Sequence, residues 1–391
     1  MSYTRREFGK LAFAGLPAAA VLGRGDSILG AFFEAKPNSL ISGVQIGAIT
    51  YSFRSMPDQS AEATLKYIVD AGISAIELMG GPVETFAGAP TSGRGGGPGG
   101  GARGARGAGE APAIPEGAKM GSWNGKQCVI QEEGARGAGG GAGRGPGGPG
   151  GRGRGEQTPE QIAAAQEQAA TLKAWRTSVS MDPFKKLRKM YNDAGVTIYA
   201  WKQLNPNMSD AELEYIFNVA EALGCTHTTL ELPGGENAAA QLKRLGDFAM
   251  KKKVYAAYHT HMQGSMTAFD EAFAISKGNM ANVDLGHWVA GGNKGGTPMD
   301  FLNKYHARTA SFHLKDRTTP EHCALNLPWG TGETPIKEIL LLVGKNKWKI
   351  PASVELEYDI PEGSDAVQET RKCVEYCRRA LTGASTTTAA R

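Results

Sequence analysis

Short apolar runs alternate with amphipathic stretches along most of the chain, from residue 43 to residue 381. An apolar run of a few residues between turn signals is typical of a buried strand, and a 3.6-residue apolar period is typical of a helix. On this basis the sequence predicts strands at 44–53, 73–79, 196–204, 227–232, 254–261, 281–288, 309–315 and 352–358.

The stretches between these runs predict helices, several of them with start and stop signals. Thr158 and Asp182 each precede a proline, an order typical of an N-cap followed by the first helical residue. Gly72 and Gly195 follow two of the stretches, where glycine commonly ends a helix. The predicted helices are 61–71, 159–176, 182–194, 210–223, 238–252, 267–277, 298–305, 335–343 and 365–381.

Strand and helix therefore alternate eight times, which favours an α/β fold with a parallel sheet. We expect a closed (β/α)8 TIM barrel over residues 40–382. An open, doubly wound sheet is the alternative. It is less favoured because no Gly-x-Gly-x-x-Gly follows the first strand, so the usual nucleotide-binding signal is missing.

Composition interrupts the alternation at 88–157, a low-complexity segment rich in Gly, Arg and Pro. The apolar surface that this segment could bury is too small to offset the entropy lost on ordering the chain. We therefore expect most of the segment to be disordered. It follows the second strand and could overhang a barrel's active face. An island at 118–133 is less biased and could dock on the barrel. A short tail, 383–391, is also expected to be disordered.

The N-terminus carries an export pattern. Arg5-Arg6 with Phe8 and Lys10, before the apolar stretch 11–23, resembles a twin-arginine signal. We set residues 1–35 aside as signal and linker and expect a bacterial protein that is periplasmic or otherwise exported. The apolar stretch is too short for a lasting membrane span. An amphipathic N-terminal helix is the alternative.

Charge and cysteine content argue against certain kinds of partner, cross-link and metal site. The net charge of +4 is mild and partly due to arginines of the insertion, which has few aromatic residues, so no nucleic-acid partner is expected. The five cysteines are odd in number and lack Cys-x-x-Cys spacing. They predict neither a disulfide framework nor a cysteine zinc site. The sequence leaves a homo-oligomer open.

Polar residues recur at the predicted C-terminal ends of the strands, where side chains of a barrel converge. His259 and His261 are two residues apart, so alternation points both imidazoles to one face. Mixed imidazole and carboxylate donors suit Mn²⁺, Zn²⁺, Co²⁺ or Fe²⁺ better than Ca²⁺. The strand-end residues are Glu77, Lys202, Glu231, His259, His261, Asp284, His287, His313, Lys315, Asp316, Glu355 and Glu357.

Four stretches resemble motifs of the xylose-isomerase-like barrel superfamily, which includes sugar-phosphate isomerases/epimerases, ketose 3-epimerases, inosose dehydratases and the distant endonuclease IV. The resemblance covers residues 43–87 and 180–380. The inosose dehydratases are the most similar in motif. The matching stretches are Tyr258-His-Thr-His-Met-Gln-Gly264, Asp284-Leu-Gly-His287, Phe312-His-Leu-Lys-Asp316 and Val354-Glu-Leu-Glu-Tyr-Asp359.

The resemblance implies one divalent metal (Mn²⁺, Zn²⁺, Co²⁺ or Mg²⁺) held by Asp284, His313 and a strand-eight glutamate, for which Glu355 is preferred over Glu357. Many members carry a glutamate on strand five, where this chain has His259. The first ligand is therefore either His259 or Glu231, which could reach in from strand four.

The implied chemistry is removal of a proton next to a carbonyl of a carbohydrate, followed by isomerisation, epimerisation or elimination. Unphosphorylated sugars or oxidised glycosides are the expected substrates. A non-catalytic sugar-binding barrel, or a partner subunit of an envelope complex, is the alternative. Lys315 and Asp316 could instead form a structural pair. The residues expected to move or orient protons are Glu231, Glu357, His261, His287 and Lys202.

Overall fold

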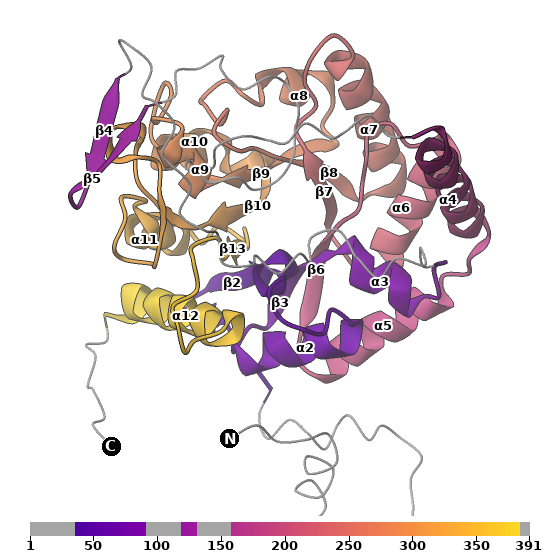
Figure 1. Ribbon diagram of the computed structural model, residues 1–391, viewed down its shortest axis with the longest axis horizontal. Helices are drawn as coiled ribbons and strands as arrows, with labels where there is room; N and C mark the ends of the chain where they lie inside the picture. Colours follow the sequence, from indigo (N-terminus) through magenta and orange to yellow (C-terminus); the bar gives the residue numbers. More distant parts are fainter. Residues whose placement is uncertain (1–35, 91–118, 131–157, 384–391) are drawn as a thin grey trace, which may run out of the picture. The chain divides into compact units, whose positions relative to one another are not determined.

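The computed structural model describes residues 36–90, 119–130 and 158–383. Within these ranges eight parallel strands close into a barrel, because the last strand of the series pairs again with the first. Figure 1 shows the strands at the centre and the helices around them. The predicted (β/α)8 barrel is confirmed. Its strands, in barrel order, are β2 (Val44–Ile49), β3 (Ala75–Met79), β6 (Thr197–Lys202), β7 (His227–Glu231), β8 (Tyr255–His259), β9 (Asn279–Asp284), β10 (Thr309–Leu314) and β13 (Ala352–Val354).

Helices follow the strands, and local signals set several of their ends. Thr158 caps α4 with a reciprocal bond to Gln161, as the Thr-Pro pair predicts. Asp182 is the first residue of α5 and not its cap, which is Met181. The helices are α2 (Ala61–Asp70), α3 (Gly80–Phe86), α4 (Pro159–Ser178), α5 (Asp182–Asp193), α6 (Asp210–Leu223), α7 (Ala238–Lys252), α8 (Asp270–Ile275), α9 (Leu285–Ala290), α10 (Pro298–Tyr305), α11 (Ile336–Asn346) and α12 (Ala366–Thr382).

Shorter elements complete the described part of the chain. β1 pairs antiparallel with the start of β2, and β11 pairs antiparallel with β12. None of the helices in the described ranges is long and apolar enough to cross a bilayer. The short elements are β1 (Leu40–Ile41), β4 (Met120–Trp123), β5 (Lys126–Val129), β11 (Asp316–Arg317), β12 (Asn326–Leu327), η2 (Thr50–Phe53), η3 (His306–Arg308) and η4 (Pro320–His322).

Several predicted strands are too long at their C-terminal ends, and in two of them this changes the element on which a site residue lies. The run 281–288 ends as a strand at Asp284, where the chain turns directly into α9 and carries His287 onto a helix. The run 352–358 ends at Val354, so the glutamates that follow lie on irregular backbone. Apolar periodicity reports burial, and both segments remain buried after the strand pairing stops.

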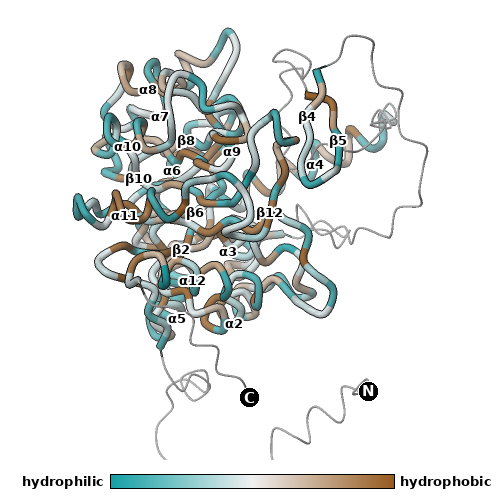
Figure 2. The backbone as a smooth tube through the Cα atoms, turned by 90° about the vertical axis from the view of Figure 1, so that its left-hand side faces the viewer, coloured by the Kyte–Doolittle hydropathy of each residue, from teal (hydrophilic) through white to brown (hydrophobic). Residues whose placement is uncertain are grey.

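The barrel interior is closely packed and partly polar. Figure 2 shows hydrophobic residues on the barrel strands and on parts of the helices around them. Gly47 on β2 leaves room for Tyr199, whose ring carbon would lie 2.9 Å from any Cβ added there. His227 is buried beside this ring and its Nε2 lies 2.9 Å from the Ser311 hydroxyl. A buried polar group is tolerated here because it has partners.

The island predicted within the insertion forms a β-hairpin. β4 and β5 pair antiparallel through Asn124-Gly125, both at positive φ, as a two-residue hairpin turn requires. A disulfide joins Cys128 on β5 to Cys323, 195 residues later. The expectation of no disulfide is therefore wrong for this pair, whose long separation no spacing rule detects. The predicted signal and linker (1–35), the remaining low-complexity residues (91–118 and 131–157) and the tail from 384 lie outside the described residues.

We expect peptide mapping of the unreduced protein to find Cys128 and Cys323 in one cross-linked peptide. Removing the bond with Cys323→Ser should lower the free energy of unfolding by about 2–4 kcal/mol, because the unfolded chain regains freedom. Cys225→Ser is the control, since Cys225 is a free buried thiol and should leave the cross-link intact. A free Cys128 in the unreduced protein would contradict the assignment.

Candidate metal centre

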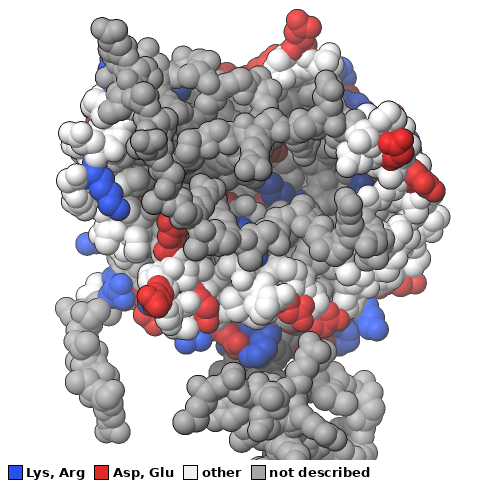
Figure 3. Space-filling model, viewed as in Figure 1, with Lys and Arg blue, Asp and Glu red and all other residues white. Residues whose placement is uncertain are grey.

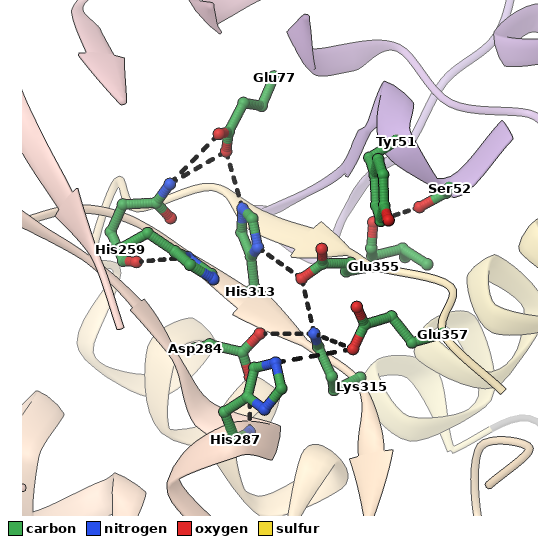
Figure 4. Close-up of polar contacts among 12 residues, drawn as sticks. Tyr51, Ser52, Glu77, His259, Asp284, His287, His313, Lys315, Glu355 and Glu357 are labelled. Carbon is green, nitrogen blue, oxygen red and sulfur yellow. Dashed lines mark hydrogen bonds and ion pairs between the residues drawn. The ribbon is translucent and has the colours of Figure 1, made fainter. Parts of the chain in front are cut away.

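Four side chains from consecutive barrel strands converge at the C-terminal end of the barrel. His259 ends β8, Asp284 ends β9, His313 lies on β10, and Glu355 follows β13. Each offers one donor atom, and these atoms all lie within 4.8 Å of one another. All four side chains are buried. Figure 4 shows them pointing toward one another.

Asp284 is oriented by the helix that follows it. Its Oδ1 accepts a hydrogen bond from the His287 backbone amide at 2.6 Å and so caps α9. The Asp-x-Gly-His stretch is thus an N-cap that leaves the second carboxylate oxygen directed elsewhere. That oxygen, Oδ2, accepts no hydrogen bond from the described residues. Lys315 Nζ lies 3.0 Å away, in an ion pair without hydrogen-bond geometry.

His259 presents one nitrogen to the group. Its Nδ1 lies 3.2 Å from the Asn282 carbonyl, which can only accept, so Nδ1 carries the proton. Nε2 keeps its lone pair. Burial, and then the charges of Lys202 and His313, hold the pKa of His259 well below its usual value. A neutral imidazole with its other nitrogen held by a carbonyl is the form that binds metals.

His313 lies between two carboxylates. Nδ1 lies 2.9 Å from Glu355 Oε2, and Nε2 lies 2.8 Å from Glu77 Oε2. Burial opposes the imidazolium charge, but the two carboxylates outweigh it and raise the pKa of His313 to about 10. Since each contact needs a donor, this ring is doubly protonated. A metal that replaced the Nδ1 proton would keep Nε2–H bonded to Glu77.

Glu77 is a residue whose role the sequence did not reveal. It lies on β3, is fully buried, and accepts hydrogen bonds from Thr229 (2.6 Å) and Asn282 (3.1 Å) as well as from His313. Burial alone would raise the pKa of Glu77, but the His313 charge lowers it to about 2. The sequence located Glu77 as a strand-end carboxylate, which is costly to bury without a partner, but did not identify that partner.

Lys315 is the second cation in contact with the buried carboxylates, after the protonated His313. Its ammonium lies 2.8 Å from Glu355 and 2.7 Å from Glu357, besides the contact with Asp284. Burial opposes its charge, yet these carboxylates raise the pKa of Lys315. Gly286 makes this packing feasible, because a Cβ there would come within 2.3 Å of the Lys315 side chain.

Lys315 and Asp316 do not serve as one structural pair. Asp316 points to the loop after β12, where its carboxylate accepts backbone hydrogen bonds at 2.7–3.2 Å. The donors are the amides of Gly330, Thr331, Gly332 and Thr334. Asp316 therefore fixes a loop, and Lys315 belongs to the site.

A second group borders the first at the rim of the barrel. Lys202 Nζ donates to Glu231 Oε1 at 2.9 Å, and Glu231 Oε2 lies 3.3 Å from His261 Nδ1. The His261 ring lies 5.0 Å from His259 and 4.8 Å from His287, between ring centroids. Glu231 thus lies beside His261 and outside the group of four. Of the two residues considered as the first ligand, it is His259 that belongs to that group. Figure 3 shows Lys or Arg side chains in a hollow near the centre of this face.

His287 and Glu357 lie on the other side of Lys315. His287 Nε2 is 3.6 Å from Glu357 Oε2, and Arg317 Nη1 donates to His287 Nδ1 at 2.5 Å. Burial, then Lys315 and Arg317, hold the pKa of His287 well below its usual value. The site therefore brings together the residues named from the strand ends except Asp316, and Arg317 joins them.

The group of four fits a divalent metal. It offers two carboxylates and two imidazoles, a donor set typical of first-row transition metals. Without a metal, the His313 imidazolium and the Lys315 ammonium balance the charge of the carboxylates. A cation is therefore favoured at this position. The residues that would hold the metal are His259, Asp284, His313 and Glu355.

Comparison with known proteins identifies the fold family. Residues 160–379 match the family described as xylose isomerase-like TIM barrel. No curated protein matches the chain. A sugar phosphate isomerase/epimerase from Parabacteroides distasonis ATCC 8503 is 14% identical, over 94% of this chain and 100% of its own, with a TM-score of 0.50.

Two further structures are similar. A xylose isomerase domain protein from Alicyclobacillus acidocaldarius is 12% identical over 87% of this chain and 100% of its own, with a TM-score of 0.50. A probable 3-DHS dehydratase from Bacillus anthracis is 12% identical over 85% and 98%, with a TM-score of 0.49. At these identities the likeness concerns the fold.

We expect Glu77→Gln to raise the dissociation constant for Mn²⁺ by about 10- to 100-fold, the usual cost of losing the carboxylate behind a ligand histidine. Isothermal titration calorimetry on metal-stripped protein measures it. Thr229→Val is the matched control, because it removes one hydrogen bond to Glu77 but keeps the charge, so its effect should be smaller. Equal affinity of Glu77→Gln and the unmodified protein would exclude this role.

Proposed function

Because the chain belongs to the xylose isomerase-like TIM barrel family, we propose that it is a metal-dependent enzyme that removes a proton next to a carbonyl of a carbohydrate. The observation that carries the proposal is the buried group of two imidazoles and two carboxylates at the ends of four consecutive strands. A bound metal would stabilise negative charge on the substrate oxygens as the carbon-bound proton leaves.

Glu357 is the residue we assign to proton removal. It lies beside the group of four, and its Oε2 lies 2.7 Å from the Lys315 ammonium. It is less enclosed than Glu355, which we assign to the metal. A base needs an accessible atom within reach of the substrate, and the partly exposed Glu357 carboxylate beside the group of four offers one.

His261 is the residue we assign to proton delivery. The Glu231 carboxylate lies 3.3 Å from Nδ1, so Nε2 is the nitrogen left to exchange a proton with the substrate. Lys202 bonds to the other oxygen of Glu231 and orients it. Glu231 and Lys202 then act through His261, and neither needs to touch the substrate.

Elimination or isomerisation is favoured over two-base epimerisation. A base on each face of the substrate carbon is the simplest route to epimerisation, and a carboxylate at the end of β8 could supply one. This chain has His259 there, and its Nδ1–H is held by a backbone carbonyl while Nε2 faces the group of four. His259 is then committed to the metal, which leaves a single carboxylate base.

We also propose that the protein works outside the cytoplasm on unphosphorylated sugars or oxidised glycosides. The Arg5-Arg6 pattern supports export, and the Cys128–Cys323 disulfide is independent support, since such bonds persist in oxidising compartments. A decayed, purely sugar-binding site is less well supported, because charged residues remain at the end of nearly every strand.

We expect the protein, incubated in D2O with a panel of ketoses and 3-keto-glycosides, to exchange a carbon-bound proton with one of them, as followed by NMR. Asp284→Asn should lose both metal and exchange. Glu357→Gln should keep the metal and slow exchange by about 10²- to 10⁴-fold. His261→Ala should impair net product formation more than exchange, because it acts after proton removal.

Asp247→Asn, on the exposed face of α7, is the control and should match the unmodified protein in metal content and exchange. Full exchange by protein stripped of divalent metal would refute the metal-dependent mechanism. Exchange that survives in Glu357→Gln would refute only the assignment of the base.

A further inference from the structure

Arg317 connects the site to a loop that the mechanism has not used. It lies on β11, two residues beyond Lys315, and is 3% exposed. Nη1 donates to His287 Nδ1, and Nη2 donates to the carbonyl of Ala324, both at 2.5 Å. One guanidinium thus bridges a histidine of the site and the turn after η4.

This contact decides where the proton of His287 lies. A guanidinium has only N–H donors and stays charged, so His287 Nδ1 must accept and cannot carry a proton. The neutral ring then carries its proton on Nε2. That nitrogen faces Glu357, 3.6 Å away, and the ring lies 4.8 Å from that of His261.

We propose that Arg317 is a positioning residue that fixes His287 as a neutral Nε2–H donor, and that the Cys128–Cys323 disulfide clamps the turn that holds Arg317. The role of His287 in the reaction rests on the function proposed above. In that role His287 donates a hydrogen bond to a substrate oxygen, whereas proton transfer stays with Glu357 and His261. A base at His287 Nε2 is excluded by the same geometry.

The turn has the form a clamp requires. Cys323 and Ala324 both have positive φ, 74° and 47°, a conformation that non-glycine residues hold only when their surroundings impose it. This backbone directs the Ala324 carbonyl to Arg317. The residue next to that carbonyl carries the disulfide to the hairpin, so the covalent bond acts one residue away from the contact.

The hairpin also packs directly on η4. A Cβ added to Gly121 would come within 2.6 Å of the Glu321 carbonyl, so only glycine permits this approach. The Trp123 and His322 rings lie 5.1 Å apart. His322 Nδ1 contacts Glu333 at 2.7 Å, which ties the turn to the far end of the loop. The hairpin, the turn and Arg317 therefore form one connected support behind His287.

The direct test is the tautomer of His287, read from nitrogen-15 and proton correlation spectra of histidine-labelled protein without substrate. The chain has seven histidines, and His287→Gln assigns the resonance. We expect the Nε2–H tautomer in the unmodified protein. Arg317→Met should convert it to a mixture of tautomers, and Arg317→Lys, which keeps a donor, should restore it at least in part.

Kinetics supply the second measurement. Arg317→Met should lower kcat/KM by about 10- to 100-fold with unchanged metal content, as expected for a residue acting through a neighbour. His287→Gln, whose amide nitrogen can replace an Nε2–H donor, should retain more activity than His287→Asn. An Nδ1–H tautomer in the unmodified protein, or an unchanged His287 signal in Arg317→Met, would overturn the proposal.

The clamp is tested with the double variant Cys128→Ser/Cys323→Ser, which leaves Arg317 in place should Arg317→Met fail to fold. We expect its His287 signal to shift toward the Arg317→Met pattern while the other buried histidines keep theirs. An unchanged His287 signal would overturn the role of the disulfide. Because these spectra need no turnover, they separate this inference from the proposed function, which is tested by deuterium exchange and by the dependence of that exchange on metal.

Discussion

The structure depends most on the balance of charge buried at the C-terminal end of the barrel. Glu77, Asp284 and Glu355 are enclosed there, and burying carboxylates is costly unless cations accompany them. His313 and Lys315, two residues apart on one strand and its continuation, supply those cations. A packed apolar core would stabilise the barrel equally well, so this arrangement is better explained by chemistry than by folding. It directs the Asp284 and Glu355 carboxylates at one point, where the His259 and His313 imidazoles also converge.

Backbone geometry converts this charge cluster into an ordered site. One carboxylate oxygen of Asp284 caps α9, and the other is directed at the cluster. Gly286, in the same turn, leaves the space in which Lys315 approaches. Each residue of the Asp-x-Gly-His motif therefore has a structural reason. Asp284 is both a candidate ligand and the cap of α9, Gly286 leaves space for Lys315, and His287 lies on the first turn of the helix. The spacing of the motif follows from these three constraints together.

The sequence predicted what local patterns encode. Eight strands and the residues at their ends could be located because burial alternates along the chain and strand ends of a barrel converge. Glu77 was located but given no role, and Arg317 was missed, because what they do depends on contacts with His313 and His287 that sequence periodicity does not report. Cys128 and Cys323 escaped for the same reason. The ends of β9 and β13 were misplaced because burial continues after pairing stops.

His261 and His287 show why residue type alone could not assign roles. Their rings lie 4.8 Å apart at the same mouth, yet their Nδ1 atoms meet opposite partners. A carboxylate, which can only accept, lies beside Nδ1 of His261, whereas Arg317 donates to Nδ1 of His287 and excludes a proton from that nitrogen. In the function proposed above, the His261 ring takes up and releases a proton at Nε2, whereas the His287 ring only donates a hydrogen bond from its Nε2. A reaction in which one group transfers a proton and another holds a substrate oxygen requires two histidines with different protonation. Here Glu231 and Arg317, the neighbours of the two rings, provide that difference.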